Sequence, residues 1–462
     1  MHSFGIGTRD PQDYLAALDR LRWTRLKRQI AYIFGNEDYY RPLFLAAGVR
    51  SPEDIRSFEE FRRLPIFLDK ARHRQSQEDS LERYGHPFGL HLTAPLEKVI
   101  HVAATSGTTG QPTFYVYTRK DLELTHLLLG RLFAAAGVRP GDTTVHAFGL
   151  SMWLAGITFF QALQAYGARP IGVGAEGGIP KILRYIEFTR PKALFATPSL
   201  LGLLIERAPD EIGKPVGALG LRTLFCVGEP GVGIAAIRHR LRDAYGAEIH
   251  DAMGGGWNNA TVSCGGPGYH GMHQMSEDYC FRYDLIDPET KEPLPLHDGA
   301  VGEALHTALE YEAAPAFRNA TGDIVRIRVG ECPHCGHFGT RMEIVGRVDD
   351  ILNVKGVKVY PSALQEVVAA FQPAVSGRIR IRLNAPPPRV EPPLRVVVEA
   401  GQDTPEASWA DLARRIEQRT RGILAVRPKV IMAPFGSLPR SSLKTKLIEI
   451  VPEDSAAERE RS

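Results

Sequence analysis

Short apolar runs alternate with amphipathic segments between residues 121 and 253, and this alternation limits the fold more than any other feature. Apolar residues at helical spacing predict helices over 121–136, 154–166, 182–188, 200–208 and 235–245. Short strands are predicted between them, over 143–148, 170–173, 193–197, 221–227 and 247–253. Strands that alternate with helices form βαβ units, in which helices cover both faces of a parallel sheet. The sequence therefore predicts an α/β fold.

The predicted secondary structure is different before and after this region. Residues 1–95 are expected to form a helical lead-in. Strand-like runs separated by Pro, Gly and Asp indicate a β-rich subdomain, over 281–286, 300–306 and 324–329. A compact α+β unit is expected after Gly346. We therefore predict a large domain over 1–347 and a small domain over 348–462, which agrees with the two or three domains that 462 residues suggest.

Charge and hydropathy exclude several classes of partner. The 56 basic and 53 acidic residues give a net charge of +3, which offers no electrostatic basis for binding nucleic acid. No apolar run approaches the roughly 18 residues that a membrane-spanning helix needs, so no membrane partner is expected. The N-terminal residues lack the apolar core of a signal peptide, and five cysteines in this length do not suggest a disulfide framework. A cytoplasmic protein is expected.

Residues 105–113 read TSGTTGQPT and have the composition of a loop that wraps an anionic ligand. Glycines let the backbone approach closely, and hydroxyl and amide N–H groups donate to phosphate oxygens. The apolar run 99–104 leads in like a strand. A polar hairpin loop without a ligand is the alternative. The segment lacks a Gly-Lys-Ser/Thr ending, so it is not a Walker loop, and no lysine from it reaches the terminal phosphates.

This stretch resembles the phosphate loop of the adenylate-forming superfamily, which includes acyl-CoA synthetases, luciferases and peptide-synthetase adenylation domains. The chain most resembles the phenylacetate–CoA ligase branch, because VKGVKVYPSALQEVV at 354–368 resembles the segment that opens the small domain there. The resemblance implies a large domain with a parallel sheet and a β-rich subdomain, followed by a small, mobile α+β domain. The phosphate contacts would come from the loop residues Thr105, Ser106, Gly107, Thr108, Thr109 and Gly110.

The activity that the resemblance implies is that of an AMP-forming acid–CoA ligase. ATP and a carboxylic acid would give an acyl adenylate and pyrophosphate, and the thiol of coenzyme A would then displace AMP. The implied cofactors are ATP, Mg²⁺ and coenzyme A. The protein itself needs no nucleophile in such a reaction. An aromatic or arylacetic acid is the expected substrate.

Further motifs follow in the order of the family. Gly228, Glu229 and Pro230 match its adenine site, although a plain strand-to-helix turn is the alternative. Asp323 matches the aspartate that accepts both ribose hydroxyls, a task that suits a carboxylate, and its alternative is a turn aspartate. Arg347 matches an arginine that contacts ribose and phosphate. Asp349 matches the hinge about which the small domain rotates, and a solvated charge cluster is the alternative.

Lys444, in PRSSLKTK at 439–446, matches the family's catalytic lysine. The resemblance implies that it reaches the carboxylate oxygen and the α-phosphate during adenylation. An ammonium group suits this role, because charge builds on both oxygens as the carboxylate attacks. Leu443 stands where the family usually has glycine, and Lys446 is expected to be a surface lysine.

The segment DAMGGGWN departs from the family. The family has an aromatic residue, glycine, threonine or serine, and then a glutamate that helps to hold magnesium. Here these positions carry Met253, Gly254, Gly256 and Trp257, and Asp251 precedes them at the expected nucleotide site. Three explanations are open: magnesium held by the phosphates and another group, a reshaped substrate pocket, or reduced activity. We favour the second, because three glycines would open space.

An aromatic substrate pocket is therefore predicted. It would be lined by residues that follow two predicted strands, namely Phe148, Trp153, Gly255, Gly256 and Trp257. Ordinary core packing of these aromatic side chains is the alternative.

A zinc site is predicted from CPHCG at 332–336 together with CGGPGYHGMH at 264–273. A CxxC followed by glycine is typical of zinc knuckles. Some relatives in the resembled branch carry a Cys–His–Cys–Cys zinc site built from these two segments. The candidate ligands are Cys264, His270, His273, Cys332 and Cys335, with the choice between the two histidines open. Reduced thiols without metal and a redox CxxC are the alternatives.

Two other functions are kept open. An acid-activating enzyme could pass its adenylate to a carrier protein or an amine instead of coenzyme A. The second is a nucleotide-binding protein without turnover, which is favoured because Trp257 stands where the family has its magnesium-binding glutamate. The identity of the acid and the oligomeric state, including a homodimer, are left open by the sequence.

Overall fold

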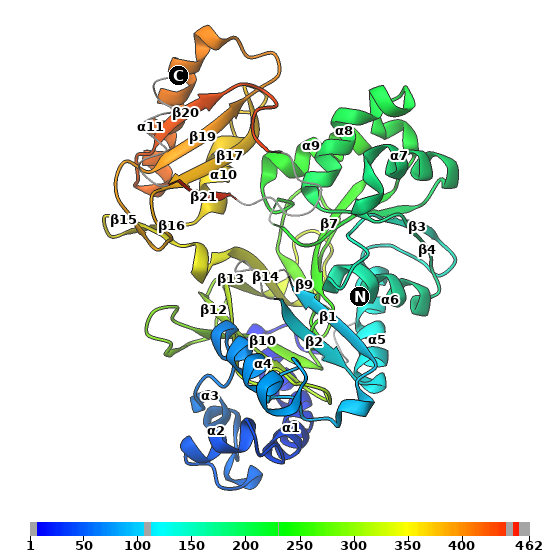
Figure 1. The fold of residues 1–462 in the computed structure, drawn as a ribbon, viewed down its shortest axis with the longest axis vertical. Coiled ribbons are helices and arrows are strands. Elements are labelled where there is room, and N and C mark those ends of the chain that lie inside the picture. Colours follow the sequence, from blue (N-terminus) through cyan, green and yellow to red (C-terminus); the bar gives the residue numbers. More distant parts are fainter. Residues whose placement is uncertain (1–6, 106–111, 230, 440–446, 452–462) are drawn as a thin grey trace.

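A computed structural model describes residues 7–105, 112–229, 231–439 and 447–451 of the chain. Its main feature is a sheet of twelve strands among these residues, in the order β11-β10-β12-β13-β14-β9-β8-β7-β6-β5-β3-β4 (Figure 1). The strands of its parallel half are β3 Thr143–His146, β4 Arg169–Gly172, β5 Ala193–Phe195, β6 Thr223–Cys226 and β7 Glu248–Gly254. The prediction of an α/β fold with a parallel sheet is confirmed.

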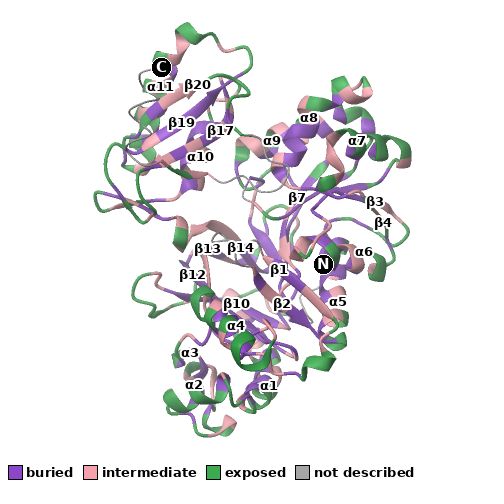
Figure 2. Cartoon of the chain, viewed as in Figure 1, coloured by how far each residue is buried: buried purple, intermediate pink, exposed green. Residues whose placement is uncertain are grey.

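Helices cover both faces of the parallel half, as the alternating pattern predicts. They are α5 Arg119–Ala135, α6 Phe159–Tyr166, α7 Gly178–Thr189, α8 Pro198–Ile212 and α9 Ala235–Tyr245. Adjacent residues of β5 point to opposite faces: Leu194 packs with α7, α8 and α9, whereas Phe195 packs with α5 and α6. Both faces are apolar and buried, as Figure 2 shows. The central strand β5 is accordingly apolar at all three of its positions.

The segment predicted as one helix over 154–166 is divided. Residues Leu154–Thr158 form a wide turn, and α6 begins only at Phe159. Gly156 has the non-helical angles φ −81° and ψ −108°. A Cβ at this position would stand 2.4 Å from the carbonyl oxygen of Gly149, so a larger residue could not enter this bend.

The β-rich segment continues the same sheet. From β7 onward the strands pair antiparallel: β8 Ala260–Ser263, β9 Met272–Gln274, β10 Cys280–Ile286, β11 Pro293–Leu294, β12 Val301–Ala308, β13 Asn319–Glu331 and β14 Phe338–Arg347. The strands expected at 281–286 and 324–329 lie within β10 and β13, and the one expected at 300–306 corresponds to β12, which begins one residue later. β7 joins the two halves, since it pairs parallel with β6 and antiparallel with β8.

The N-terminal helices pack beside the antiparallel half. They are α1 Pro11–Phe34, α2 Tyr40–Ala46, α3 Phe58–Arg63 and α4 Lys70–Tyr84. Asp10 caps α1 by accepting from the amides of Gln12 and Asp13. Buried Glu277 ties α1 to the sheet, because it accepts from the hydroxyl of Tyr14 at 2.6 Å and from Thr340. After α4, the antiparallel hairpin β1 His101–Thr105 and β2 Thr113–Tyr117 leads to α5.

The C-terminal residues form a separate lobe with its own core (Figure 1). Its elements are β15 Leu352–Val354, β16 Val357–Val359, α10 Pro361–Ala369, β17 Val375–Leu383, β18 Arg389–Val390, β19 Arg395–Ala400, α11 Trp409–Leu424, β20 Lys429–Ala433 and β21 Ile448–Ile450. A four-stranded sheet in the order β20-β19-β17-β21 carries the two helices. The expected α+β unit is present.

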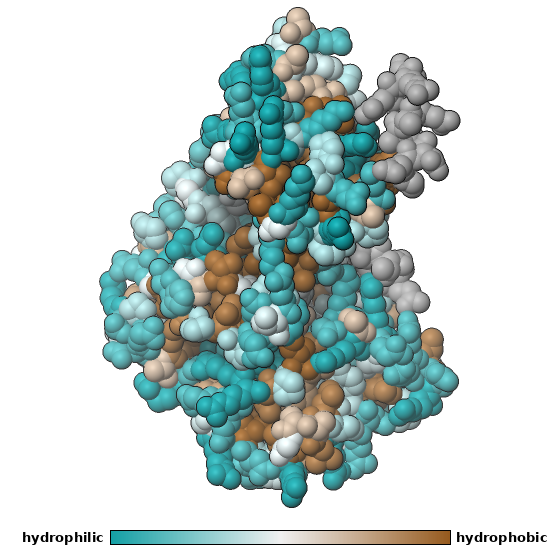
Figure 3. All heavy atoms as spheres, turned by 90° about the vertical axis from the view of Figure 1, so that its left-hand side faces the viewer, coloured by the Kyte–Doolittle hydropathy of each residue, from teal (hydrophilic) through white to brown (hydrophobic). Residues whose placement is uncertain are grey.

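The surface in the view of Figure 3 is covered largely by hydrophilic side chains with short apolar patches. Within the described ranges, no helix has both the length and the apolar content that crossing a membrane requires.

Candidate functional site

The two ends of the predicted phosphate loop are held by the β1–β2 hairpin. Thr105 and Thr113 are paired across the hairpin, so the intervening residues leave one strand and return into the other. Among the predicted phosphate contacts, Thr105 is described, and residues 106–110 lie outside the described part of the chain. The amide of Ala104 donates to the carbonyl of Met152 at 2.6 Å, which fixes the hairpin beside the segment that follows β3.

The loop that follows β7 lies directly against β2. We call Gly254, Gly255, Gly256 and Trp257 the 254–257 loop. The hydroxyl of Tyr117 donates to the carbonyl of Gly255, and the ring of Tyr115 lies 4.6 Å from that of Trp257 between centroids. Strand β2, which follows the predicted phosphate loop, thus packs against the 254–257 loop. In the resembled family, the segment that corresponds to the 254–257 loop lies at the nucleotide.

Two acidic residues near the predicted adenine site are held by hydrogen bonds. Glu229 accepts from the amide of Ser199 at 2.7 Å, and it follows Gly228, whose φ of +99° favours glycine. Asp251 accepts from the hydroxyl of Tyr269 at 2.8 Å. Burial raises the pKa of Asp251 to about 6. Met253 lies two residues after Asp251 in β7, and Pro230 lies outside the described residues.

Asp323 and Arg347 form an ion pair at the end of the antiparallel half. They face each other in the register of β13 and β14, and Nη1 of Arg347 lies 2.5 Å from Oδ1 of Asp323. Burial alone would lower the pKa of Arg347, but the carboxylates of Asp323, Asp349 and Asp350 outweigh it and raise the pKa. The two predicted ribose contacts are therefore adjacent and oppositely charged.

The predicted hinge residue Asp349 pairs with α4. Its Oδ2 accepts from Nζ of Lys70 at 2.7 Å, and both side chains are partly exposed. Burial would raise the pKa of Asp349, but Lys70 outweighs this effect and lowers it. The hinge is thus connected to the large lobe by an ion pair that solvent can reach. Lys444, the predicted catalytic residue, lies outside the described residues.

Neighbouring groups lie close to the position that a Cβ would take at each of the three glycines that were expected to open a pocket. A Cβ at Gly254 would stand 2.8 Å from the carbonyl oxygen of Asn259. One at Gly255 would stand 3.3 Å from the ring of Phe159, and one at Gly256 would stand 3.2 Å from the ring of Tyr115. The glycines therefore allow close packing of the 254–257 loop at these three positions.

The three aromatic residues predicted to line this pocket differ in their surroundings. Phe148 is 4% exposed and belongs to the core beneath α5, which is the ordinary packing that the alternative interpretation expected. Trp153 is partly exposed and forms a β-bridge with Ala104. It is therefore the predicted pocket aromatic that retains access to solvent.

Trp257 is packed on all sides. It is 8% exposed, and its indole N–H donates to the carbonyl of Ala314 at 2.9 Å. Its ring lies among those of His73, Tyr115 and His306, with centroids at 5.7, 4.6 and 6.2 Å. This geometry favours a packed aromatic residue over the pocket wall that the sequence analysis preferred.

We therefore expect Trp257→Phe to destabilise the protein by about 1–3 kcal/mol, because the buried carbonyl of Ala314 would lose its donor. Urea unfolding measures this change. The Michaelis constants for the acid and for ATP are expected to stay within about twofold of the wild-type values. A raised constant for the acid alone, with unchanged stability, would restore Trp257 to the substrate pocket.

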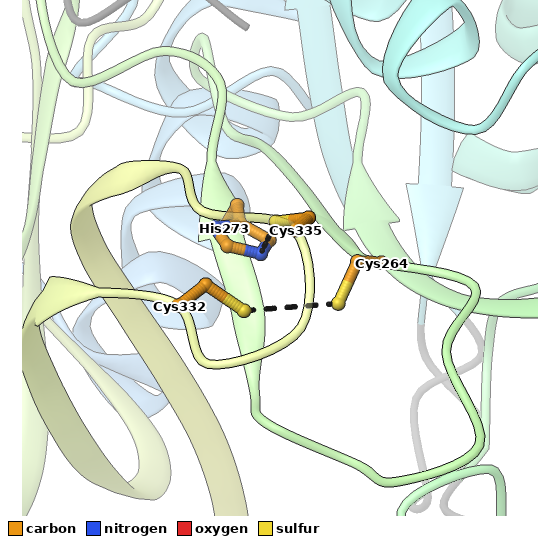
Figure 4. Close-up of side chains that lie close together, drawn as sticks. All are labelled: Cys264, His273, Cys332 and Cys335. Carbon is orange, nitrogen blue, oxygen red and sulfur yellow. Dashed lines mark hydrogen bonds between the residues drawn. The ribbon is translucent and has the colours of Figure 1, made fainter.

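Four of the five predicted metal ligands converge (Figure 4). One ligand atom from each of Cys264, His273, Cys332 and Cys335 lies within 4.8 Å of the others. The sulfurs of Cys264 and Cys332 are 3.9 Å apart, and the sulfur of Cys335 lies 3.5 Å from Nε2 of His273. Tetrahedral zinc with Zn–S of about 2.3 Å would separate two sulfurs by about 3.8 Å, and sulfur and nitrogen by about 3.6 Å. The donor set and its spacing therefore fit zinc.

The neutral ring of His273 suits a metal ligand, whereas the thiol of Cys264 would have to lose its proton when a metal binds. Burial, together with the neighbouring thiols of Cys332 and Cys335, raises the pKa of Cys264 to about 12. Burial lowers the pKa of His273 to about 3, so its ring is neutral, as a metal ligand must be. His270 does not belong to the group, although it was an equal candidate in the sequence. It is only partly buried and precedes β9, whereas His273 lies within that strand.

Sequence reasoning missed the aromatic residues of β2. Tyr115 and Tyr117 directly follow the predicted phosphate loop, yet no strand was predicted there. The β-branched and aromatic residues of TFYVY are the signal that could have revealed a strand, in which both tyrosines lie on one face. His73 on α4 was also missed, because its proximity to Trp257 depends on long-range packing.

Comparisons with known proteins agree with this arrangement. Residues 356–449 match the family of AMP-binding enzyme C-terminal domains. The phenylacetate–coenzyme A ligase of Thermus thermophilus is 32% identical over 457 residues, which cover 93% of this chain and 95% of the relative. A crystal structure of 2-hydroxyisobutyryl-CoA ligase in the postadenylation state, in complex with R3-HIB-AMP, has a TM-score of 0.85 and 25% identity, and covers 96% of this chain and 92% of the other.

A structure of 2-hydroxyisobutyryl-CoA ligase in the thioesterification state, with 2-HIB-AMP and CoA, has the same coverage and 26% identity, but a TM-score of 0.66. The extent and level of the sequence similarity show that the chain belongs to the phenylacetate–coenzyme A ligase family.

Proposed function

We propose that this member of the phenylacetate–coenzyme A ligase family activates a carboxylic acid with ATP and transfers the acyl group to coenzyme A. The observation that carries the proposal is that its similarity to a phenylacetate–coenzyme A ligase spans 93% of the chain and therefore both lobes. Adenylation would release pyrophosphate, and thioester formation would release AMP. We propose an aromatic or arylacetic acid as the substrate, in keeping with the name of that relative.

The nucleotide is proposed to lie between the 254–257 loop and the Asp323–Arg347 pair. Asp323 would accept from the ribose hydroxyls, and Arg347 would face ribose and phosphate, since it already lies 2.5 Å from that carboxylate. The hydroxyls and amides of residues 105–110 would bind the phosphates. Magnesium is proposed to be held by the phosphates and a further group, because Trp257 offers no oxygen ligand and its indole donates to Ala314.

The two half-reactions are proposed to use different arrangements of the lobes, with the boundary between 347 and 348. The present arrangement supports the adenylation side, because the TM-score is 0.85 to a postadenylation structure and 0.66 to a thioesterification structure of an identically named ligase. Arg378 of the small lobe pairs with Glu206 of the large lobe at 3.4 Å, and Lys358 pairs with Glu289 at 2.6 Å. Water screens the exposed Lys358–Glu289 pair, whereas the Arg378–Glu206 pair is largely buried and would have to separate if the lobe rotates.

Cys264, His273, Cys332 and Cys335 are proposed to hold a structural zinc ion. Bound zinc would join the segment between β8 and β9 to the turn between β13 and β14. Four protein ligands fill a tetrahedral coordination sphere, which leaves no open position for a substrate. The ion would therefore stabilise the fold and take no part in the reaction.

A nucleotide-binding protein without turnover is the second candidate, and the packed Trp257 at the position of the family glutamate favours it. Acid-dependent exchange of pyrophosphate into ATP separates the two. We expect exchange with at least one aromatic or arylacetic acid, and none without acid. Binding of ATP without any acid-dependent exchange would favour the second candidate.

A further inference from the structure

Arg378, on β17 of the small lobe, stands between two carboxylates. Its Nη2 lies 3.4 Å from Oε1 of Glu206 on α8 of the large lobe. Its Nε lies 3.8 Å from Oε1 of Glu399 on the neighbouring strand β19. The side chains of Arg378 and Glu206 are 18% and 16% exposed, and that of Glu399 is fully buried. One guanidinium therefore joins a carboxylate of its own lobe to a carboxylate across the interface.

Glu399 holds the chain that leads to Lys444. Its Oε2 accepts from the amide of Leu438 at 2.9 Å, six residues before the lysine in the sequence. Among the described residues no hydrogen bond reaches Oε1 of Glu399, so the nearby guanidinium of Arg378 compensates this buried charge. Through Glu399, Arg378 is thus connected to the start of the segment that carries the lysine.

On the large lobe, Glu206 belongs to the helix that supports the predicted adenine motif. Ser199 and Glu206 are seven residues apart on α8, which is about two turns, and therefore lie on the same side of the helix. The amide of Ser199 donates to Glu229, and Nη2 of Arg240 on α9 donates to Glu206 at 3.3 Å. Ser199, Glu229 and Arg378 line one cavity of about 70 Å³ between the lobes. Arg378 thus meets the large lobe next to the proposed nucleotide site.

We propose that Arg378 is a positioning residue for adenylation, whose pair with Glu206 holds the small lobe in the arrangement that brings the Lys444 segment to the nucleotide. This inference rests on the proposed function, in which the small lobe rotates between the two half-reactions. The pair forms only while Arg378 faces α8, so it stabilises the adenylation arrangement and not the other. Glu399 moves together with Arg378, so its buried charge is compensated in both arrangements.

Glu206→Gln tests the pair, because it removes the charge across the interface and leaves Arg378 beside Glu399. We expect acid-dependent pyrophosphate exchange to slow about 3- to 30-fold, between the effects of losing an exposed ion pair and a buried charged hydrogen bond. Thioester formation from a supplied acyl adenylate should be at least as fast as in the wild type, since the pair no longer has to break. A residue that only stabilises the fold would not separate the two rates.

Arg240→Gln is the matched control, since it removes a partner of Glu206 that lies within the large lobe. The ratio of its two rates should stay within about twofold of the wild-type ratio. A double-mutant cycle with Arg378→Gln separates the pair from the instability that arises when Glu399 loses its cation. In pyrophosphate exchange, Glu206→Gln should cost little once Arg378 is replaced. In thioester formation, the two substitutions should show no coupling.

The outcomes distinguish this inference from the proposed function. Equal slowing of both half-reactions in Glu206→Gln, or an unchanged rate of exchange, would overturn the role of the Arg378–Glu206 pair and leave the proposed function standing. The same separation of rates in Arg240→Gln would also overturn it, because that arginine belongs to the large lobe. A wild-type protein that shows neither exchange nor thioester formation would overturn both.

Discussion

Lys444→Ala is expected to slow adenylation by at least about 10²- to 10³-fold, the usual loss when one preorganised group that stabilises transition-state charge is removed. Lys444 is assigned from its register in PRSSLKTK, since residues 440–446 lie outside the described part of the chain. The loss should be confined to the first half-reaction. A supplied acyl adenylate should still be converted to the thioester by the variant. In that step the substrate carboxylate has already been joined to AMP, so Lys444 has no attacking carboxylate to neutralise.

Lys446→Ala is the matched control, since it removes the same charge two residues away. Its rates in both half-reactions should stay close to those of the wild type. Pyrophosphate exchange measures the first half-reaction, and thioester formation from the synthetic adenylate measures the second. Equal loss of both half-reactions in Lys444→Ala would contradict the assigned role, as would a larger loss in Lys446→Ala.

About one zinc ion per chain should co-purify with the protein, and Cys332→Ser or Cys335→Ser should lose it. A ligand that binds only the folded state stabilises by about 4 kcal/mol when its free concentration is a thousand times its dissociation constant. We therefore expect each serine variant to lose several kcal/mol in the free energy of unfolding, that is, about 3–5 kcal/mol. Elemental analysis and urea unfolding, without chelator during purification, measure the two effects.

Cys226→Ser controls for the general cost of changing a buried thiol. Cys226 is fully buried in the core under α7, α8 and α9 and lies outside the metal cluster, so this variant should be destabilised yet keep its zinc. His270→Ala should likewise keep zinc, whereas His273→Ala should lose it. Protein free of zinc, or loss of zinc from the Cys226 variant as well, would contradict the proposed site.

The helices and strands that the sequence predicts well are those whose local spacing of apolar residues matches the faces that they bury. β5 is apolar throughout because both of its faces are covered, and α9 carries its apolar residues on one face, so both were predicted close to their observed bounds. The strand expected at 99–104 is present as β1, but its partner β2 was not predicted, because it begins at Thr113, inside the segment read as a loop. The wide turn at 154–158 was missed because the apolar spacing does not reveal that the backbone of Gly149 lies close to Gly156.

The same distinction holds for the site. The convergence of three cysteines and one histidine was expected from the CxxC motif together with the family resemblance, although the choice of His273 over His270 required the placement of β9. The three glycines at 254–256 suggested open space, since the sequence does not reveal that Phe159 and Tyr115 fill it. Ion pairs such as Lys70–Asp349 and Glu206–Arg378 join residues far apart in the chain, and no local pattern indicates them.

The central claim is that this chain joins a carboxylic acid to coenzyme A through an acyl adenylate. The most direct measurement is the release of AMP by the purified wild-type protein, with ATP, coenzyme A and a panel of aromatic and arylacetic acids. We predict AMP and an equal amount of acyl-CoA thioester with at least one acid, and no AMP when either the acid or coenzyme A is omitted. AMP release that needs neither the acid nor coenzyme A, or no AMP with any acid of the panel, would contradict the account.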